Sequence, residues 1–101
     1  MNSEPEVLFT NDVALVRLMA LQPHEVGVRH FHTALSETVI CVEGEILMFV
    51  AGTEAPTVLA PGQHATVSRL IPHWLENRSS AIAKYVLAQN GGTYDFCVMP
   101  D

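Results

Sequence analysis

The sequence predicts a single all-β domain, a sandwich or barrel built from short strands. Short segments rich in Val, Leu, Ile, Thr and Phe alternate with turn residues, and no apolar run has the length and period of a helix. Hydrophobic residues make up 49% of the 101 residues and charged residues only 16%, so the chain can fill one core. The alternation of strands and helices that a βαβ fold requires is missing from the pattern.

The expected strands follow one another at short intervals. In chain order they are residues 13–21, 27–31, 38–42, 45–50, 57–59, 64–68, 73–77 and 81–88. Glu43-Gly44 predicts a tight hairpin turn between the third and fourth segments, and Pro61-Gly62 ends the fifth. The remaining residues form a tail that Gly91-Gly92 interrupts. Short strands with regular turn signals are typical of a β-sandwich or a β-barrel.

Residues 45–50 are apolar on both faces of the expected strand. A strand with one face in water would alternate apolar and polar side chains. One face therefore fills the barrel, and we expect the other to meet a second sheet or a second subunit. The composition also holds more apolar surface than a monomer of this size can hide. Together these observations predict a homodimer.

The charge of the chain argues against two classes of partner. The net charge is −6, and the basic residues are scattered rather than gathered in a stripe that could neutralise a row of phosphates. They are Arg17, Arg29, Arg69, Arg78 and Lys84. We therefore expect no nucleic-acid partner and no binding to an anionic membrane.

The sequence contains no targeting or membrane-spanning pattern. Residues 1–6 are polar and acidic, and they lack the positive charge and apolar stretch of a secretory signal. The longest apolar run, residues 46–51, is far too short to span a bilayer. We expect a soluble, cytoplasmic protein.

The two cysteines, Cys41 and Cys97, stand far apart and have no CxxC spacing. The chain has enough core without a covalent link, so two small buried apolar side chains are favoured over a disulfide. Cys41 lies near the site described next, and an apolar pocket there could include it.

The histidines suggest a metal site. His30 and His32 stand two residues apart, which on a strand puts both imidazoles on one face and Phe31 on the other. Glu37 follows at an interval that suits a short loop and the start of the returning strand, which brings a carboxylate beside the pair. His73 stands far along the chain, and spacing alone does not place it. Because a strand histidine is more often a hydrogen-bonded residue than a ligand, spacing leaves both interpretations open.

Two stretches of the chain resemble the conserved motifs of the cupin superfamily. Residues 30–44 have the form H-x-H-x4-E-x6-G, which is similar to the first motif. Residues 62–77 are similar to the second motif, G-x5-P-x-G-x2-H-x3-N, with the glycine, histidine and asparagine at the matching intervals. The resemblance covers residues 13–87, and the first motif is the more specific half.

Three turn positions depart from the family pattern. His24 and Leu70 stand where the family has glycine, and Ser68 stands where it has proline. These departures concern the local course of the backbone rather than the residues that carry donor atoms.

The resemblance implies one cupin domain over residues 1–101, with its core at about residues 13–88, folded as a jelly-roll β-barrel or double-stranded β-helix. It also implies a dimer, with a metal ion in the mouth of the barrel. The ligands carried over from the two motifs are His30, His32, Glu37 and His73. Three imidazoles and one carboxylate suit one divalent ion, which can be Fe²⁺, Mn²⁺, Ni²⁺, Co²⁺, Cu²⁺ or Zn²⁺.

Such a site is compatible with more than one function. The first is a metalloenzyme of the dioxygenase, isomerase, decarboxylase or lyase type that acts on a small polar or anionic molecule. The alternative is a non-enzymatic module that binds or senses a small ligand through the metal. A third interpretation is a metal-free barrel with unused ligand residues. No catalytic acid or base is assigned, since Tyr85 is expected to be packed and His24 and His64 to be solvated turn residues.

Overall fold

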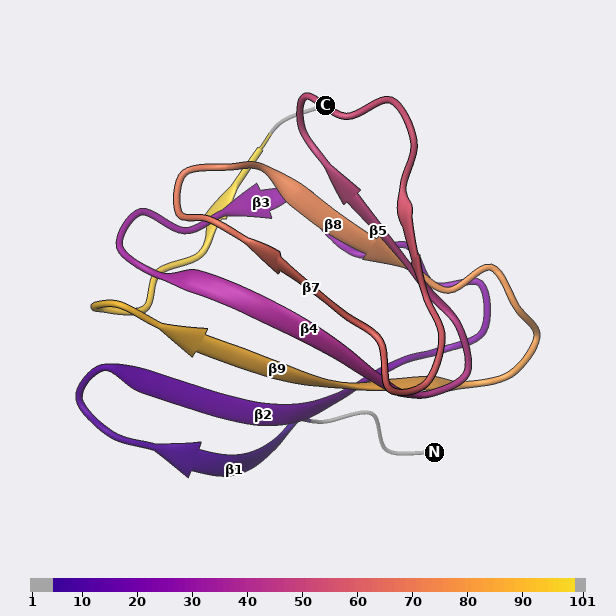
Figure 1. The fold of residues 1–101 in the computed structure, drawn as a ribbon, viewed down its shortest axis with the longest axis horizontal. Helices are drawn as coiled ribbons and strands as arrows, with labels where there is room; N and C mark the ends of the chain where they lie inside the picture. Colours follow the sequence, from indigo (N-terminus) through magenta and orange to yellow (C-terminus); the bar gives the residue numbers. More distant parts are fainter. Residues whose placement is uncertain (1–4, 100–101) are drawn as a thin grey trace.

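The computed structural model describes residues 5–99, in which the regular secondary structure consists of β-strands. The predicted domain of residues 1–101 thus includes termini, residues 1–4 and 100–101, that lie outside the described residues. The strands in Figure 1 are β1 (Glu6–Thr10), β2 (Ala14–Leu21), β3 (His30–Phe31), β4 (Ser36–Glu43), β5 (Ile46–Val50), β6 (Thr57–Leu59), β7 (His64–Val67), β8 (His73–Glu76), β9 (Ala83–Asn90) and β10 (Cys97–Val98).

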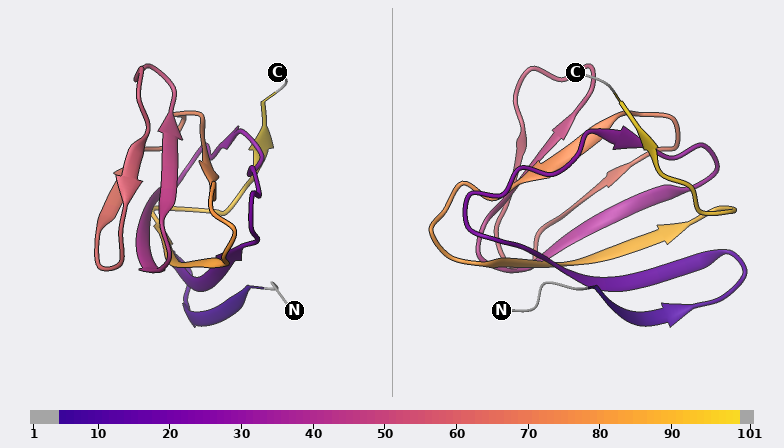
Figure 2. Two further views of the ribbon diagram at one scale, coloured as in Figure 1. Left: turned by 90° about the vertical axis from the view of Figure 1, so that its right-hand side faces the viewer. Right: turned by 180° about the vertical axis from the view of Figure 1, so that it is seen from behind.

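The strands form two five-stranded sheets, and within each sheet all neighbouring strands are antiparallel. The first sheet has the order β1-β2-β9-β4-β7, and the second has the order β10-β3-β8-β5-β6. From β3 onward the chain changes sheets at almost every connection, which is the connectivity of a double-sheet jelly roll. In the view from behind in Figure 2, β3 and the yellow β10 lie in front of the other strands. The predicted all-β class is confirmed.

The core lies between the sheets and follows the two-residue period of the strands. Alternate residues of β9, from Ala83 to Gln89, are buried, and those between them are half-buried. Glu37, Val39 and Cys41 alternate in the same way on β4. The main apolar cluster consists of Leu21, Val39, Cys41, Ile46, Met48, Leu59, Val67, Ala83, Tyr85 and Leu87. The carboxylate of Glu37 therefore lies on the same inward face as the core.

The predicted hairpin at Glu43-Gly44 is wrong. β4 ends at Glu43 and β5 begins at Ile46, but the two strands belong to different sheets and do not pair. Gly44 has a φ of 80°, and a Cβ there would lie 3.1 Å from the Cα of Ala83. The glycine therefore allows a close corner between the two sheets. A turn signal predicts a change of direction, but it does not specify whether the next strand pairs with the preceding one.

Two strands lie outside the predicted set, and one predicted strand is shorter by more than one residue. β1 pairs with β2 at the edge of its sheet although its side chains are all exposed, and β10 pairs with β3. Within residues 27–31 only β3 is regular, with an isolated bridge between Val26 and Glu76 just before it. Edge strands and two-residue strands bury too little to leave a periodic pattern in a sequence.

The outer face of the second sheet carries a stack of planar side chains. The rings of Phe49 and Trp74 are stacked with their centroids 4.8 Å apart. The Arg29 guanidinium lies 5.6 Å from the Trp74 ring centre, and the Arg78 guanidinium lies 5.4 Å from the Phe49 ring centre. Part of the second apolar face of residues 45–50 is therefore covered within the chain itself.

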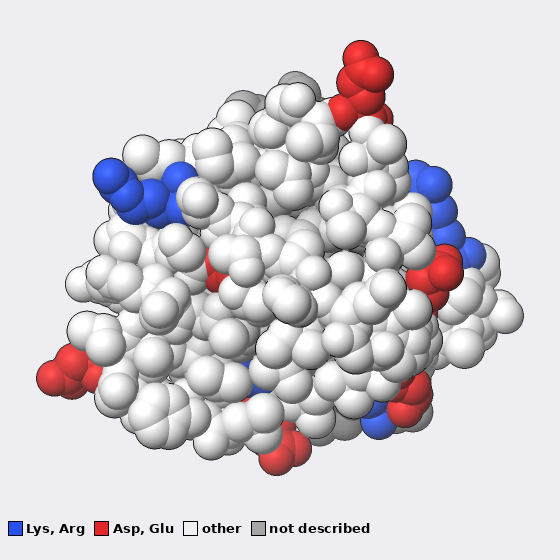
Figure 3. Space-filling model, in the orientation of Figure 1, with Lys and Arg blue, Asp and Glu red and all other residues white. Residues whose placement is uncertain are grey.

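Charged side chains are spread thinly over the surface. In Figure 3 the red and blue atoms lie mostly near the edge of the view, and no blue stripe crosses it. Within residues 5–99, the structure has no helix that is long and apolar enough to cross a membrane.

Two departures from the motif pattern lie in left-handed turns. His24 has a φ of 61° and Leu70 a φ of 71°, a region that costs a residue other than glycine about 1 kcal/mol or more. The Leu70 N–H donates to the carbonyl of His32 at 2.7 Å. At both positions the backbone thus adopts the left-handed conformation that glycine favours. The hydrogen bond of Leu70 joins its turn to the backbone of His32.

Candidate metal centre

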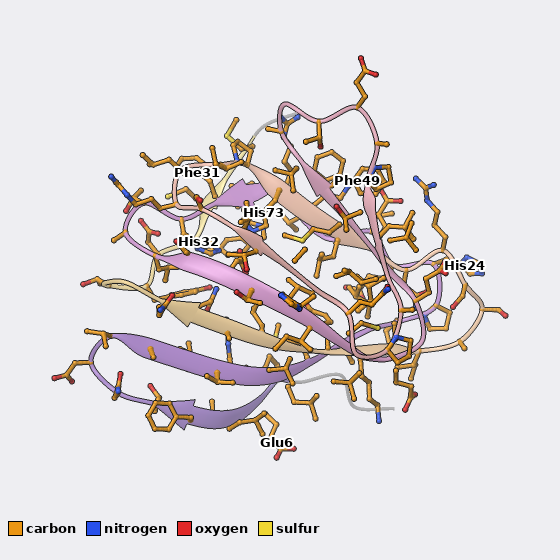
Figure 4. All side chains as sticks on the ribbon, in the orientation of Figure 1. Glu6, His24, Phe31, His32, Phe49 and His73 are labelled. Carbon is orange, nitrogen blue, oxygen red and sulfur yellow. The ribbon has the colours of Figure 1, made fainter. Side chains whose placement is uncertain are left out.

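The four side chains singled out in the sequence converge between the two sheets. His30 on β3 is directly opposite His73 on β8 in the register of the second sheet. Glu37 belongs to β4 of the first sheet, and His32 directly follows β3 in the connection to β4. Figure 4 shows His32 and His73 close together between the sheets, with His24 far from both. Two imidazoles come from the second sheet, the third comes from the connection between β3 and β4, and the carboxylate comes from the first sheet.

One carboxylate oxygen is the common point of the cluster. The Oε1 atom of Glu37 lies 2.9 Å from Nε2 of His32 and 3.8 Å from Nε2 of His30, and it also contacts Nε2 of His73. The potential donor atoms of the four residues all lie within 4.8 Å of one another. His32, Glu37 and His73 are each 3% exposed, whereas His30 is half-buried. The cluster is therefore closed to solvent except on the side of His30.

Backbone carbonyls hold the other nitrogen of each imidazole. The Nδ1 atoms of His30, His32 and His73 lie 2.7, 2.5 and 2.9 Å from the carbonyl oxygens of Val28, Asp95 and Ile71, respectively. Because a carbonyl oxygen can only accept, each Nδ1 carries the hydrogen and donates it. In the neutral state, each Nε2 then directs a lone pair towards Glu37.

This arrangement is compatible with a metal cation among the four side chains. Three neutral imidazoles would direct their lone pairs at an anionic oxygen, which has no hydrogen to share. Three protonated imidazoles would repel one another, since their ring centroids lie only 4.4 to 5.6 Å apart in a largely buried site. One divalent ion can accept all four lone pairs at once. The donor set thus fits a divalent metal ion.

Burial and neighbouring charges also shift the titration of these groups. Burial lowers the pKa of His30, and the hydrogen bond to the Val28 carbonyl offsets this only in part. Burial also opposes the charged forms of Glu37 and His73, but their mutual hydrogen bond and attraction outweigh it. The pKa of Glu37 is therefore lowered and that of His73 raised. Without a metal, the site favours a carboxylate beside one imidazolium.

A cavity of about 330 Å³ opens beside the cluster and reaches His30, His32 and Glu37. Its other walls come mainly from inward-facing side chains of β2 and β9 and from the segment after β9. They include Arg17, Met19, Leu75, Tyr85, Leu87 and Gln89. The volume lies at the lower end of the range for ligand pockets, which is roughly 300–1,000 Å³, so the cavity suits a small molecule.

The segment after β9, which the sequence predicts to be a tail, supports the cluster. The carbonyl of Asp95 accepts from His32, and its carboxylate accepts from the N–H and hydroxyl of Thr33 at 2.9 and 2.5 Å. Phe96 stacks on the ring of His30 with the centroids 4.1 Å apart. No sequence signal indicates these contacts, because Asp95 is separated from Thr33 by 62 positions.

The other residues considered in the sequence occupy less central positions. His24 and His64 are exposed, as expected for solvated histidines. Cys41 is buried but does not line the cavity, Cys97 is half-buried, and both thiols are free. Tyr85 is buried and lines the cavity, where burial raises its pKa. Tyr85 therefore stays protonated near neutral pH.

Asn77, the last residue of the second motif, forms hydrogen bonds with backbone groups of the barrel and with none of the four cluster residues. Its side chain is 1% exposed, and Oδ1 accepts from the N–H of Ser79 at 3.0 Å. Its Nδ2 lies 2.7 to 3.2 Å from the carbonyl oxygens of Leu21, Gln22 and Ala81. This side chain joins the loop after β8 to the end of β2.

A sequence family described as cupin domain matches residues 17–88 of the chain. That range contains all four residues of the cluster and most of the predicted core. A search of curated proteins found no match to the sequence.

Several solved structures share the fold at low sequence identity. The TT1209 protein of Thermus thermophilus is 24% identical, with a TM-score of 0.80 over 90% of this chain and 85% of that protein. A conserved protein of Klebsiella pneumoniae with a double-stranded β-helix domain is 19% identical, with a TM-score of 0.83 over 100% of this chain and 89% of that protein. An oxalate oxidase is 18% identical, with a TM-score of 0.75 over 83% of this chain but only 45% of its own. The predicted jelly-roll fold is confirmed.

Proposed function

The chain belongs to the cupin family, and from that premise we propose that it is a metalloenzyme acting on a small polar or anionic molecule. The proposed ligands of its single divalent ion are His30, His32, Glu37 and His73. The observation that carries the proposal is the direction of the lone pairs: backbone carbonyls accept from the three Nδ1 atoms, so each imidazole, when neutral, presents the lone pair of Nε2 beside the Glu37 carboxylate. A divalent cation satisfies all of them.

The donor set limits what the ion can be and do. Three neutral imidazoles and one carboxylate suit Fe²⁺, Mn²⁺, Ni²⁺, Co²⁺, Cu²⁺ or Zn²⁺, and they leave the centre with one net positive charge. When bound, such an ion polarises an oxygen-containing substrate as a Lewis acid, or supplies redox chemistry if it is iron, manganese or copper. The residues around it bind and orient the substrate, and the buried cluster keeps bulk water from three of the four ligands.

The reaction class we propose is that of a dioxygenase, isomerase, decarboxylase or lyase. All four reactions can begin with an anionic or enolisable oxygen substrate beside a cationic centre. The cavity volume of about 330 Å³ suits a molecule of that kind. The fold shared with an oxalate oxidase supports a small organic acid as the substrate, and it leaves the reaction itself to be tested.

A second candidate function is a non-enzymatic module that binds or senses a small ligand through the metal. One observation favours it: among the described residues that line the cavity, no carboxylate or imidazole outside the cluster is buried. A general acid or base would then have to come from an exposed group or from the substrate itself. Four protein ligands would also close the shell of a tetrahedral zinc ion.

We further propose that residues 1–101 act as one cytoplasmic domain that forms a homodimer. Every side chain of β1 is exposed, including Val7, Leu8 and Phe9, each at least 50% exposed. An apolar strand that is open on both faces is a typical protein–protein contact surface. Light scattering of the purified protein at micromolar concentration tests this, and a monomer mass at all concentrations would contradict it.

The metalloenzyme proposal is tested by metal analysis followed by turnover assays. Protein purified without chelator is expected to contain close to one equivalent of a divalent metal. Protein loaded with Fe²⁺ or Mn²⁺ should convert a small organic acid, and the Fe²⁺ form should show a substrate-induced spectral change under anaerobic conditions. Tightly held zinc with no turnover on a library of small acids would favour the binding module, and the absence of any metal would refute both functions.

A further inference from the structure

A single arginine lines the cavity beside the metal cluster. Arg17 lies on β2, where the alternation that buries Leu21 points its side chain inward with Met19. Among the described residues of the cavity wall it carries the one guanidinium, and no lysine accompanies it. A charged side chain on the inner face of a barrel is costly unless it finds partners of opposite charge.

The partners that Arg17 has within the chain leave most of its donors free. Its Nη2 donates to Oε1 of Gln89 at 3.0 Å, and its Cζ lies 5.6 Å from the centre of the Tyr94 ring. The Nε atom is buried and has no hydrogen-bond partner among the described residues. Arg17 also takes part in none of the ion pairs found within residues 5–99. A guanidinium has five N–H donors, so several remain for an anion.

The nearest acidic groups do not neutralise this charge. Glu37 belongs to the metal cluster. Glu25 also lines the cavity, but it is exposed, and its Oε1 accepts from the backbone N–H of Gln22 at 2.8 Å. Both carboxylates are therefore engaged elsewhere, and the positive charge of Arg17 remains available to a ligand.

The strand register separates Arg17 from the metal cluster by one strand. Gln89 on β9 is opposite Glu37 on β4 and, on its other side, opposite Leu15 on β2. Arg17 lies two positions along β2 from Leu15. Two strand spacings, about 10 Å, therefore separate the backbone of Glu37 from that of β2. The cluster and the arginine line the same cavity, and Leu87 lies on the wall between their strands.

We propose that Arg17 binds a carboxylate at the far end of a ligand whose other end lies at the metal cluster. The substrate class is then a small dicarboxylic acid or a comparable acid with two polar ends and a short apolar link. A carboxylate matches the planar guanidinium in a two-point contact, and Gln89 holds the arginine in place. The inference rests on the proposed metal function, because the cluster must bind the other end of the ligand.

The test measures how well the protein distinguishes a terminal carboxylate from a neutral group of the same size. The probes are straight-chain dicarboxylates of two to six carbons, each paired with its monoamide. Each is titrated by calorimetry into Mn²⁺-loaded and metal-free protein. The variants are Arg17→Met, which keeps the apolar stem, and Arg17→Lys, which keeps the charge without the planar fork. Arg69→Met is the matched control, because Arg69 is exposed and lies outside the cavity.

For at least one chain length, the wild type should bind the dicarboxylate about ten- to a hundredfold more tightly than the monoamide. Arg17→Met should abolish that preference, Arg17→Lys should retain part of it, and Arg69→Met should leave it unchanged. Circular dichroism verifies that each variant is folded. The same preference in Arg17→Met and in the wild type, or no preference at any length, would overturn the role of Arg17.

The two proposals can fail separately in this experiment. If the protein takes up Mn²⁺ but Arg17→Met changes nothing, the metal function stands and the arginine site is refuted. If the protein takes up no metal but the carboxylate preference still depends on Arg17, the anion site stands and the metal function is refuted.

Discussion

Replacing Glu37 by glutamine separates metal binding from the packing of the barrel, because the two side chains have almost the same size. Glu37 is the one anion of the cluster, it is 3% exposed, and it lies against all three imidazoles. The variant keeps the volume and one acceptor oxygen, but it removes the negative charge that the divalent ion requires.

The size of the effect follows from the linkage between binding and stability. A metal present at a hundred times its dissociation constant stabilises the folded state by about 2.7 kcal/mol. For a chain of 101 residues, the unfolding entropy is about 0.2 kcal/mol per kelvin, so that stabilisation raises the Tm by about 13 °C. If Glu37→Gln weakens metal binding about a hundredfold, the same metal concentration raises the Tm of the variant by only about 2 °C.

The assay is thermal melting followed by circular dichroism, with and without Mn²⁺ or Zn²⁺ and after treatment with a chelator. His64→Gln is the matched control, because His64 is exposed on β7 and lies outside the cluster. The control should keep the full shift. A wild-type Tm that does not respond to metal or chelator, or an equal shift in Glu37→Gln, would show that these residues do not hold an ion.

Three further perturbations test other parts of the account. In metal-free protein, the pKa of His73 is raised above its ordinary value of 6.5, so the stability that this shift adds is lost as the pH rises above 6.5. The pKa of Glu37 is lowered below its ordinary value of 4.5, so the stability that this shift adds is lost as the pH falls below 4.5. The stability difference between wild type and Glu37→Gln, measured by urea unfolding, should be largest between these values, and a difference that keeps growing above pH 7 would contradict it. Leu70→Asn should stabilise the protein by about 1 kcal/mol, because asparagine tolerates the left-handed φ of 71°. Leu70→Val should destabilise it, because a β-branched residue tolerates this φ poorly. If the Val variant were the more stable of the two, the backbone of Leu70 would not be strained. Asn77→Ala should cost about 2–4 kcal/mol in the same assay, because buried carbonyls lose their donor; a loss below 1 kcal/mol would show that water replaces the side chain.

The sequence contained enough local information to predict that three of the four cluster residues lie near one another, and the resemblance was needed to identify them as metal ligands. His30, His32 and Glu37 lie within one short stretch, and strand alternation places both imidazoles towards the same space. His73 entered only through the resemblance, since its place opposite His30 depends on the pairing of β3 with β8. The two residues are far apart in the chain, and no spacing rule specifies such a pairing.

Features that depend on the relation between the two sheets were not predictable in this way. Glu43-Gly44 has the composition of a hairpin turn, yet the chain passes there from one sheet to the other. Asp95 and Phe96 reach His32 and His30 through long-range contacts that leave no periodic pattern.

In the sequence, Arg17 is only one of several scattered basic residues, and the charge of a side chain does not show whether it points into the barrel or into solvent. Its position on the inward face of β2 is visible only once the register of β2 and β9 is known. A charge that composition assigns to the surface can thus lie in the wall of a cavity.

X-ray absorption spectroscopy of the metal-loaded protein counts the donor atoms around the ion and so shows whether the four side chains bind it together. We predict three imidazole nitrogens and a carboxylate oxygen at about 2.0–2.2 Å, the range for such ligands on zinc, and the loss of one nitrogen scatterer in His73→Ala. A spectrum with sulfur ligands, or one that is unchanged in His73→Ala, would place the ion elsewhere and contradict the account.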